Sequence, residues 1–302
     1  MHGVIPVNKP KGLTSHDVVM RMRRILHMKK VGHTGTLDPE VTGVLPICIG
    51  EGTKLTEYLQ TKKKRYYAEV TLGFSTDTED QTGEVTGRSE GVTGISDEAI
   101  DQAIGTFPGS YHQMVPKYAS VRVDGRKLYE YARKGIEVER PVREVFIHEI
   151  ERTGRVEREA GLVRFSLDVS CSKGTYIRTL AVDIGRHLGV EAHMSALVRT
   201  ESCGLTLDRA VTLEALQEGE PRGFIVPISE LIEDLPSVEI TDESFFFKIR
   251  NGQKMDKSDI IEKVGKDDAD MVAFTSEGVP VGIYYDHPEH TDIMKPYKMF
   301  NI

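Results

Sequence analysis

Two stretches of the chain alternate hydrophobic and polar residues, and each predicts a β-strand with one buried face. In the first stretch, the residues that share a face are Tyr66, Ala68, Val70 and Leu72. In the second stretch, they are Val163, Phe165, Leu167 and Val169. The apolar run from Val44 to Ile49 indicates a short buried strand, and a further strand is indicated by Val145, Ile147 and Ile150.

Two other segments have the spacing of amphipathic helices. Thr14 and Asp17 are placed as in a capping box, and apolar residues follow at helical spacing, so we expect a helix that starts here and ends by Gly32. A second helix is predicted between Thr175 and Leu188.

The irregular alternation of strands and helices favours an α+β fold with a mostly antiparallel or mixed central sheet. Leu235-Pro236 is a plausible domain boundary, and the strand-like runs 271–274 and 281–285 follow it. We therefore expect a large domain over 1–235 and a small β-rich domain over 236–302.

Composition argues against a membrane protein and against a secreted protein held by disulfides. No run approaches 18 apolar residues, so we expect no membrane span, and the chain start lacks the apolar run of a signal peptide. The three cysteines are few and widely spaced, which favours reduced thiols in a cytoplasmic protein over a disulfide framework.

The charge is unevenly distributed along a chain whose net charge is −8. Residues 1–66 carry 12 basic and 5 acidic side chains, and residues 117–143 carry 8 and 4, whereas residues 233–302 carry 8 and 15. Basic regions on an acidic chain are typical of an RNA-binding protein with restricted contact surfaces. The alternative is that these charges are ordinary solvated surface.

Asp38 is the most informative candidate for chemistry. It lies in a loop of glycine, threonine, proline and apolar residues, and no Lys or Arg occurs between Val31 and Gly50. A carboxylate on such a loop, in front of a buried strand, is a candidate reactive group. The alternative is a turn aspartate that caps a local N–H beside Pro39.

Four motifs, in order and spacing, resemble those of the TruB family, the bacterial tRNA pseudouridine-55 synthases. They are VNKPKGLTSHDVV at 7–19, GHTGTLDPEVTGVLPICIG at 32–50, KRYYAEVTLGFSTDTEDQTG at 64–83 and SKGTYIRTLAVDIG at 172–185. The resemblance implies the pseudouridine synthase fold, with an RNA-gripping insertion at about 117–143. The segment 241–255, TDESFFFKIRNGQKM, resembles the start of a PUA module, an RNA-binding domain.

The resemblance also implies a reaction: the T-loop uridine at position 55 of tRNA is flipped out, its glycosidic bond is broken, and the base is rejoined through carbon. Asp38 is expected to be the nucleophile or base, buried in a largely apolar pocket. A buried aspartate needs a cation partner to remain ionised, and Arg178 is expected to be that partner. Tyr66 is expected to stack on the base, although a core tyrosine is the alternative. The residues expected to bind substrate are His33, Asp80, Tyr176, Leu197, Lys9, Lys62, Lys64 and Arg65.

The expected partner is the T-arm of tRNA, and we expect a monomer with no obligatory protein partner. An isomerisation requires no cofactor, and the chain has no recognisable metal or P-loop motif. The catalytic motifs begin almost at Gly3, which favours a stand-alone enzyme over an RNA-guided one. The rival function is an RNA-binding folding helper in which catalysis is incidental.

Overall fold

The computed structural model describes residues 1–264 and 269–301, and a nine-stranded sheet forms its centre. Seven strands follow the order β1-β3-β12-β4-β11-β10-β7, while β2 pairs with β3 and β13 pairs with β12. Their bounds are β1 Gly3–Lys9, β2 Val31–His33, β3 Thr42–Ile49, β4 Lys64–Leu72, β7 Gly109–Met114, β10 Val142–Glu159, β11 Leu162–Cys171, β12 Ala192–Ser202 and β13 Leu205–Thr206. β12 runs parallel to β3 and antiparallel to β4, so the predicted mixed sheet is confirmed.

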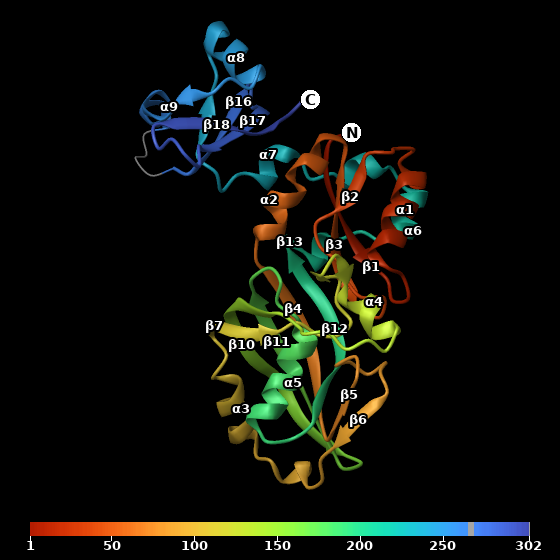
Figure 1. Ribbon diagram of the computed structural model, residues 1–302. Helices are drawn as coiled ribbons and strands as arrows, with labels where there is room; N and C mark the ends of the chain where they lie inside the picture. Colours follow the sequence, from red (N-terminus) through yellow and green to blue (C-terminus); the bar gives the residue numbers. More distant parts are fainter. Residues whose placement is uncertain (265–268, 302) are drawn as a thin grey trace.

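Short helices flank this sheet and complete the α+β fold (Figure 1). The α-helices are α1 Ser15–Ile25, α2 Thr56–Thr61, α3 Asp97–Ile104, α4 Leu128–Arg133, α5 Ile177–His187, α6 Leu213–Glu218, α7 Ile228–Leu231, α8 Glu243–Arg250 and α9 Lys257–Val264. The 3₁₀ helices are η1 Gly50–Leu55, η2 Val92–Gly94, η3 Leu207–Arg209 and η4 Pro221–Phe224. Two small hairpins pair β5 Phe74–Thr76 with β6 Val85–Arg88, and β8 Arg122–Val123 with β9 Arg126–Lys127.

The start of α1 is the predicted capping box. The Thr14 hydroxyl accepts from the Asp17 N–H at 3.1 Å, and the Asp17 carboxylate accepts from the Thr14 N–H at 2.9 Å. The helix ends at Ile25 rather than near Gly32, because residues 31–33 are extended and pair with β3.

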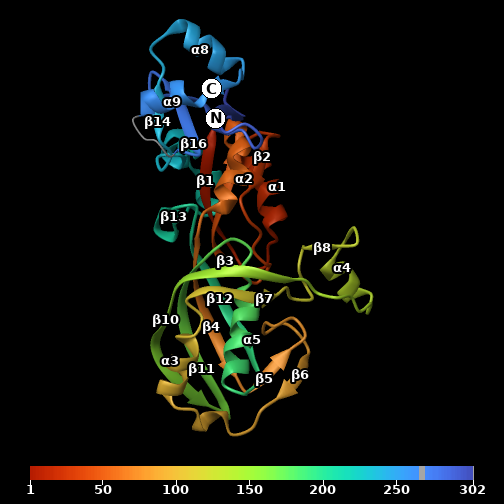
Figure 2. The ribbon, with the colours of Figure 1, turned by 60° about the vertical axis from the view of Figure 1, so that its left-hand side comes forward.

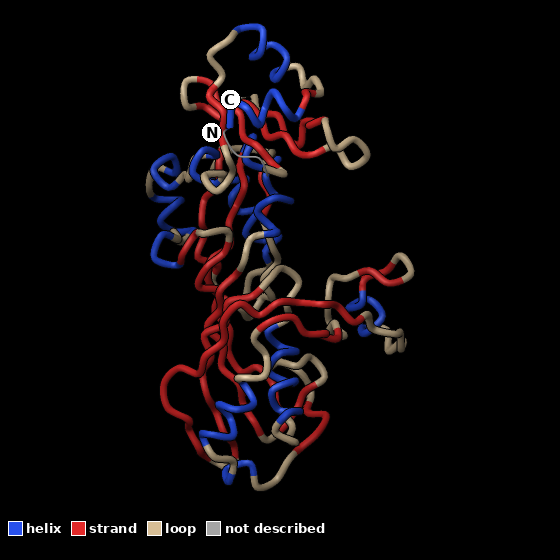
Figure 3. The backbone as a smooth tube through the Cα atoms, turned by 90° about the vertical axis from the view of Figure 1, so that its left-hand side faces the viewer, coloured by secondary structure: helices blue, strands red, loops and turns tan. Residues whose placement is uncertain are grey.

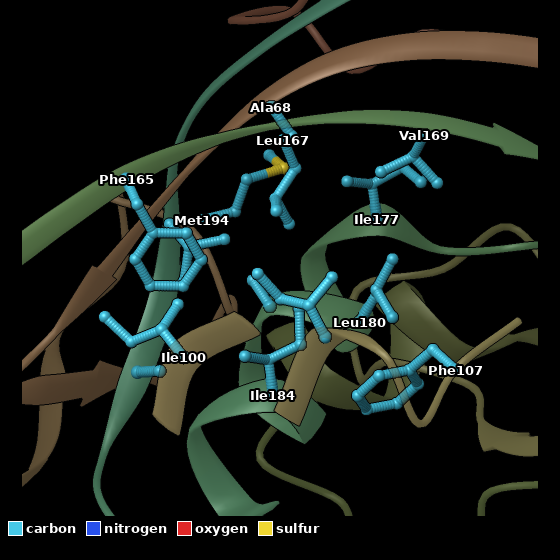
Figure 4. Close-up of a cluster of buried hydrophobic side chains, with 14 of the residues drawn as sticks. Ala68, Ile100, Phe107, Phe165, Leu167, Val169, Ile177, Leu180, Ile184 and Met194 are labelled. Carbon is cyan, nitrogen blue, oxygen red and sulfur yellow. The ribbon is translucent and has the colours of Figure 1, made fainter. Parts of the chain in front are cut away.

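The predicted alternation of β4 is confirmed by burial. Ala68, Val70 and Leu72 are fully buried, whereas Tyr67 on the other face is 42% exposed. Figure 4 shows α5 packed against this face, with Leu180 and Ile184 in the core. This packing anchors α5, whose first turn carries Arg178.

Residues 117–143 form a small lobe that projects from the body of the molecule (Figure 2). The hairpin β8–β9 turns at Asp124 and Gly125, which have φ of 49° and 81°, as a tight two-residue hairpin turn requires. Leu128 lies in a small apolar cluster of the lobe, against which Tyr176 packs. The tube in Figure 3 shows how β10 connects this lobe to the main sheet.

The C-terminal residues form a second sheet of five strands in the order β14-β16-β17-β18-β15. Their bounds are β14 Ser237–Glu239, β15 Met255–Asp256, β16 Met271–Ser276, β17 Val279–Asp286 and β18 Ile293–Met299. This confirms a small β-rich C-terminal module that begins just after Pro236. The domain boundary itself and the PUA identity stay predictions.

A continuous apolar cluster joins this module to the rest of the chain. Phe300 and Ile283 are buried together with Val4 and Leu55, and Lys54 Nζ donates to the Met299 carbonyl at 2.6 Å. The C-terminal module therefore packs against one end of the central part, next to α2 and α7, with the chain termini near the junction (Figure 1).

Candidate active site

A cleft of about 700 Å³ lies between the loop after β2, strands β4 and β12, the start of α5 and the lobe of residues 117–143. Six of the residues predicted from sequence line it: Asp38, Lys64, Tyr66, Tyr176, Arg178 and Leu197. They come from four distant parts of the chain, so the fold brings the motifs together.

Arg178 and Asp38 form the central ion pair of the cleft. Arg178 Nε lies 3.2 Å from Asp38 Oδ2, and the Arg178 side chain is only 7% exposed. The predicted pairing of these residues is present in the structure. The expectation that Asp38 is buried is wrong, because its side chain is 44% exposed to the open cleft.

The other nitrogens of Arg178 contact two neighbouring segments. Nη1 donates to the Thr78 carbonyl at 3.0 Å, and Nη2 donates to the Tyr118 carbonyl at 3.1 Å. Tyr118 belongs to the lobe 117–143, so one guanidinium joins the lobe, the Thr78 turn and the Asp38 loop.

Asp80 shapes the turn that holds the Thr78 carbonyl. Its Oδ1 accepts from the hydroxyls of Thr78 at 2.8 Å and Thr82 at 2.6 Å, and from the Thr82 N–H at 2.9 Å. Its Oδ2 lies 3.9 Å from Arg178 Nη1. This geometry supports the positioning of Arg178, whereas the expected contact of Asp80 with the base stays a prediction.

Tyr66 and Tyr67 face opposite sides of β4, as the alternation predicted. Tyr66 lines the cleft, and burial raises the pKa of its hydroxyl although the Arg199 guanidinium acts in the opposite direction. The Tyr67 hydroxyl instead donates to Ser166 on the outer face of the sheet, at 2.7 Å.

Tyr176, which lies just before α5, is held by a buried glutamine. The Gln113 side chain accepts from the Tyr176 N–H at 2.8 Å and donates to the Tyr176 carbonyl at 3.0 Å. Sequence reasoning missed Gln113, because a polar residue on an edge strand has no distinguishing pattern.

His33 stands at the entrance to the Asp38 loop. Its Nδ1 accepts from the Gly35 N–H at 3.2 Å, and burial, together with the nearby Arg199, lowers its pKa. A neutral imidazole therefore shapes this end of the loop. Contact with RNA stays a prediction for His33.

Two lysines predicted to bind phosphate have little exposed surface, although one of them, Lys64, lines the cleft. Lys9 is fully buried, and its ammonium donates to the carbonyls of Pro10, Leu13 and Pro39. Lys64 is 6% exposed and donates to the carbonyls of Gln60 and Lys62. In this structure the ammonium groups of Lys9 and Lys64 already satisfy backbone oxygens, which indicates a role in holding the backbone of the site. Phosphate contacts by Lys9 and Lys64 stay predictions.

The remaining predicted basic residues are partly exposed and form ion pairs. Lys62 pairs with Asp234, and Arg65 Nε lies 2.6 Å from Asp168. Lys63, between them in the sequence, is exposed. Phosphate contacts by Lys62 and Arg65 stay predictions.

Arg199 is the main site residue that sequence reasoning did not assign. It lines the cleft although the residue is only 1% exposed. Its position two residues after Leu197 on the same strand is the signal that could have found it, because alternate residues share a face.

Three further observations concern metal binding, membrane spans and the state of the cysteines. Within residues 1–264 and 269–301, no cluster of three or more His, Cys, Asp or Glu is arranged to hold a metal ion. None of the helices in the described chain is long and apolar enough to cross a membrane. The cysteines Cys48, Cys171 and Cys203 are free and buried.

Comparison with known proteins agrees with the motifs. Residues 23–177 match the N-terminal domain of the TruB family pseudouridylate synthases, and residues 178–231 match the C-terminal domain of tRNA pseudouridylate synthase B. The chain is 49% identical over 305 residues to tRNA pseudouridine synthase B of Bacillus pumilus (strain SAFR-032), covering 100% of this chain and 98% of the relative. It is 44% identical over 303 residues to tRNA pseudouridine synthase B of Bacillus subtilis (strain 168), covering 99% and 97%.

Solved structures support the same assignment. A structure of an H/ACA RNP bound to a substrate RNA containing 2′-deoxyuridine matches with a TM-score of 0.71 and 26% identity, covering 100% of this chain and 86% of that one. A Cbf5-Nop10-Gar1 complex matches with a TM-score of 0.69 and 28% identity, covering 94% and 78%. Together with the Asp38–Arg178 pair in the cleft, these matches establish that the chain belongs to the TruB family of tRNA pseudouridine synthases, which are isomerases.

Proposed function

We propose that the protein converts the T-loop uridine at position 55 of tRNA to pseudouridine, as a stand-alone enzyme that uses Asp38. The observation that carries the proposal is the Asp38–Arg178 contact of 3.2 Å, in a cleft that Tyr66 also lines. A carboxylate held by a cation next to an aromatic ring suits a reaction on a flipped nucleobase.

The reaction divides into three steps. First, the uridine leaves the folded T-loop and its base stacks on Tyr66. Second, the N1–C1′ bond breaks with Asp38 acting as nucleophile or base, and the bonding electrons leave with the uracil. Third, the detached uracil turns and C5 bonds to C1′; any bond that Asp38 formed as nucleophile breaks in this step, and any sugar proton that it removed as base is returned. The proton lost from C5 is balanced by one gained at N1. Product and substrate are isomers, so the reaction requires no oxidant, reductant or cofactor.

The electrostatics of the cleft suit this sequence of steps. The charged residues that line it are Asp38, Lys64, Arg143, Glu144, Lys173, Arg178 and Arg199. The positive excess favours approach of an RNA backbone and stabilises negative charge on the detached uracil. Tyr176 and Leu197 supply apolar walls that keep water from the broken bond.

The protein acts as a monomer in the cytoplasm without an obligatory protein partner. The similarity covers 97–98% of the length of relatives named tRNA pseudouridine synthase B, so a chain of this size spans nearly the whole of those enzymes, which supports a stand-alone form. Position 55 follows from the motif resemblance, and the exposed positive lobe of residues 117–143 supports contact with the T-arm.

The test is to treat an unmodified tRNA transcript with the purified protein and map pseudouridine at nucleotide resolution. Pseudouridine at position 55, and none in a transcript with cytidine at that position, is the expected result. Modification at another uridine would contradict the assigned position. Tight binding without modification would favour the RNA-folding helper instead.

A further inference from the structure

Arg199 lies at the junction of the three segments that build the cleft. It is 1% exposed and belongs to β12, where its register partners are Tyr66 on β4 and Gly43 on β3. A Cβ atom at Gly43 would lie 2.2 Å from the Arg199 carbonyl oxygen, so this approach requires glycine. The backbone of Arg199 therefore connects the strand of Tyr66 to the end of the Asp38 loop.

The side chain of Arg199 spans the two ends of that loop. Nε donates to the Val44 carbonyl at 2.7 Å, and Nη2 donates to the Gly35 carbonyl at 3.2 Å. Gly35 precedes Asp38 and Val44 follows it. Lys9 Nζ donates to the Pro39 carbonyl at 3.1 Å and so holds the middle of the loop.

Arg199 makes these contacts at an energetic cost. Burying a guanidinium is unfavourable unless its hydrogen bonds are made, and no carboxylate of the described residues lies within ion-pair distance of it. Asp38 is instead oriented toward Arg178. The hydrogen bonds of the guanidinium to the Val44 and Gly35 carbonyls hold the loop, and the guanidinium also acts to lower the pKa of the Tyr66 hydroxyl. This arrangement fits a role in holding the loop beside Tyr66, while Arg178 holds the carboxylate.

We infer that Arg199 is a positioning residue, which fixes the loop of Asp38 relative to Tyr66 so that the carboxylate and the ring meet the same nucleotide. The inference rests on the proposed function of Asp38 and Tyr66. It assigns Arg199 to the assembly of the site and not to direct contact with the reacting atoms.

The experiment compares Arg199→Met, which keeps length and loses the donors, with Arg199→Lys, which keeps the charge and loses the fork of donors. Arg164→Met is the matched control, because Arg164 lies on β11 of the same sheet and does not line the cleft. Each protein is measured for single-turnover rate at saturating tRNA, for tRNA affinity, for thermal unfolding and for amide hydrogen exchange across residues 34–41.

Arg199→Met is expected to reduce the single-turnover rate by about 100-fold, with affinity within about threefold, because small displacements of catalytic groups cost this much. In Arg199→Met, hydrogen exchange in the loop 34–41 is expected to increase. Arg199→Lys is expected to give values between those of Arg199→Met and the unchanged protein, and the control Arg164→Met is expected to match the unchanged protein. Hydrogen exchange can be measured whether or not the protein is active, so it tests the positioning role by itself. Turnover by the unchanged protein tests the proposed function separately.

Two results would overturn the inference. One is a folded Arg199→Met protein whose single-turnover rate is within threefold of that of the unchanged protein. The same holds if the fold-loss in single-turnover rate equals the fold-loss in tRNA affinity. The other is unchanged exchange of residues 34–41 in Arg199→Lys, which decides the matter if Arg199→Met does not fold. Lower thermal stability with an unchanged rate would show a purely structural role.

Discussion

Arg178 Nε lies 3.2 Å from Asp38 Oδ2, while the other nitrogens of the same guanidinium donate to the carbonyls of Thr78 and Tyr118. A single side chain therefore holds the proposed catalytic carboxylate and also contacts the lobe 117–143. Because arginine presents its donors in a rigid fork, the position of the lobe and the orientation of Asp38 are linked.

Asp38→Asn is expected to lower the single-turnover rate by at least about 10³-fold, because asparagine keeps the shape of the side chain and removes the anion. Affinity for tRNA is expected to change by no more than a few-fold. The measurement is pseudouridine formation in a quenched time course, with binding followed separately. Glu40→Gln is the matched control, because Glu40 pairs with Lys11 at 3.0 Å. Substantial turnover by Asp38→Asn would end the assignment of Asp38.

Arg178→Lys is expected to lower the rate by about 100-fold, since lysine cannot bind Asp38, Thr78 and Tyr118 together. Proteolysis of the lobe 117–143 should become faster in this variant, because the hydrogen bond to the Tyr118 carbonyl is absent. Arg143→Lys, at the base of the lobe, serves for comparison. Equal rates for Arg178→Lys and the unchanged protein would show that the fork is dispensable.

Tyr66→Leu is expected to cost far more activity than Tyr67→Leu, because only Tyr66 lines the cleft. Loss of base stacking costs about 1–3 kcal/mol, which corresponds to a reduction of roughly 5- to 150-fold. Tyr66→Phe retains the ring and reports on the hydroxyl. Single-turnover rates of the three folded variants decide the point, and similar losses for both leucine variants would contradict the assigned stacking surface.

Glu51 is expected to make stability depend on pH in the acid range. Burial acts to raise its pKa, but hydrogen bonds from Lys30, Lys54 and the Asn301 N–H outweigh burial and lower the pKa from 4.5 to about 2. A carboxyl whose pKa is lower in the folded protein stabilises it above pH 4.5 and loses that contribution as the pH falls toward 2.

The contribution of Glu51 is expected to be about 1–3 kcal/mol at neutral pH. Thermal unfolding of Glu51→Gln and the unchanged protein, measured from about pH 7 to about pH 3, should therefore differ at neutral pH, and the difference should shrink as the pH falls below 4.5. Glu57→Gln is the control, because Glu57 pairs with Lys298 but is 73% exposed. A constant difference across this range would contradict the assigned ion pairs.

The basic surface of the catalytic part is expected to dominate RNA binding. The test variant replaces the exposed residues Lys63, Arg122 and Arg126 by alanine. The slope of log affinity against log salt concentration should become shallower, by up to about 0.9 for each phosphate that is no longer neutralised. Titrations at several salt concentrations measure this slope. The matched triple variant replaces Lys248, Arg250 and Lys254 of the acidic C-terminal module, and a larger effect of that variant would reverse the prediction.

Local sequence rules determined the elements on which the site is built. Alternation placed Tyr66 and Tyr67 on opposite faces of β4, and the capping box at Thr14 marked the start of α1. The order of the motifs identified the family and the partners Asp38 and Arg178. Such features depend on neighbours in the chain or on the order and spacing of motifs, so a sequence carries them directly.

Only the tertiary structure decided the contacts and the exposure of each charged side chain. Lys9 and Lys64 look like surface cations in the sequence, yet their ammonium groups bind buried carbonyls. Arg199 meets Gly35 across 164 residues of chain, and Asp38 is more exposed than an apolar loop predicts. The environment of a charged side chain depends on which distant backbone groups need a partner, and that is settled only when the sheet is assembled.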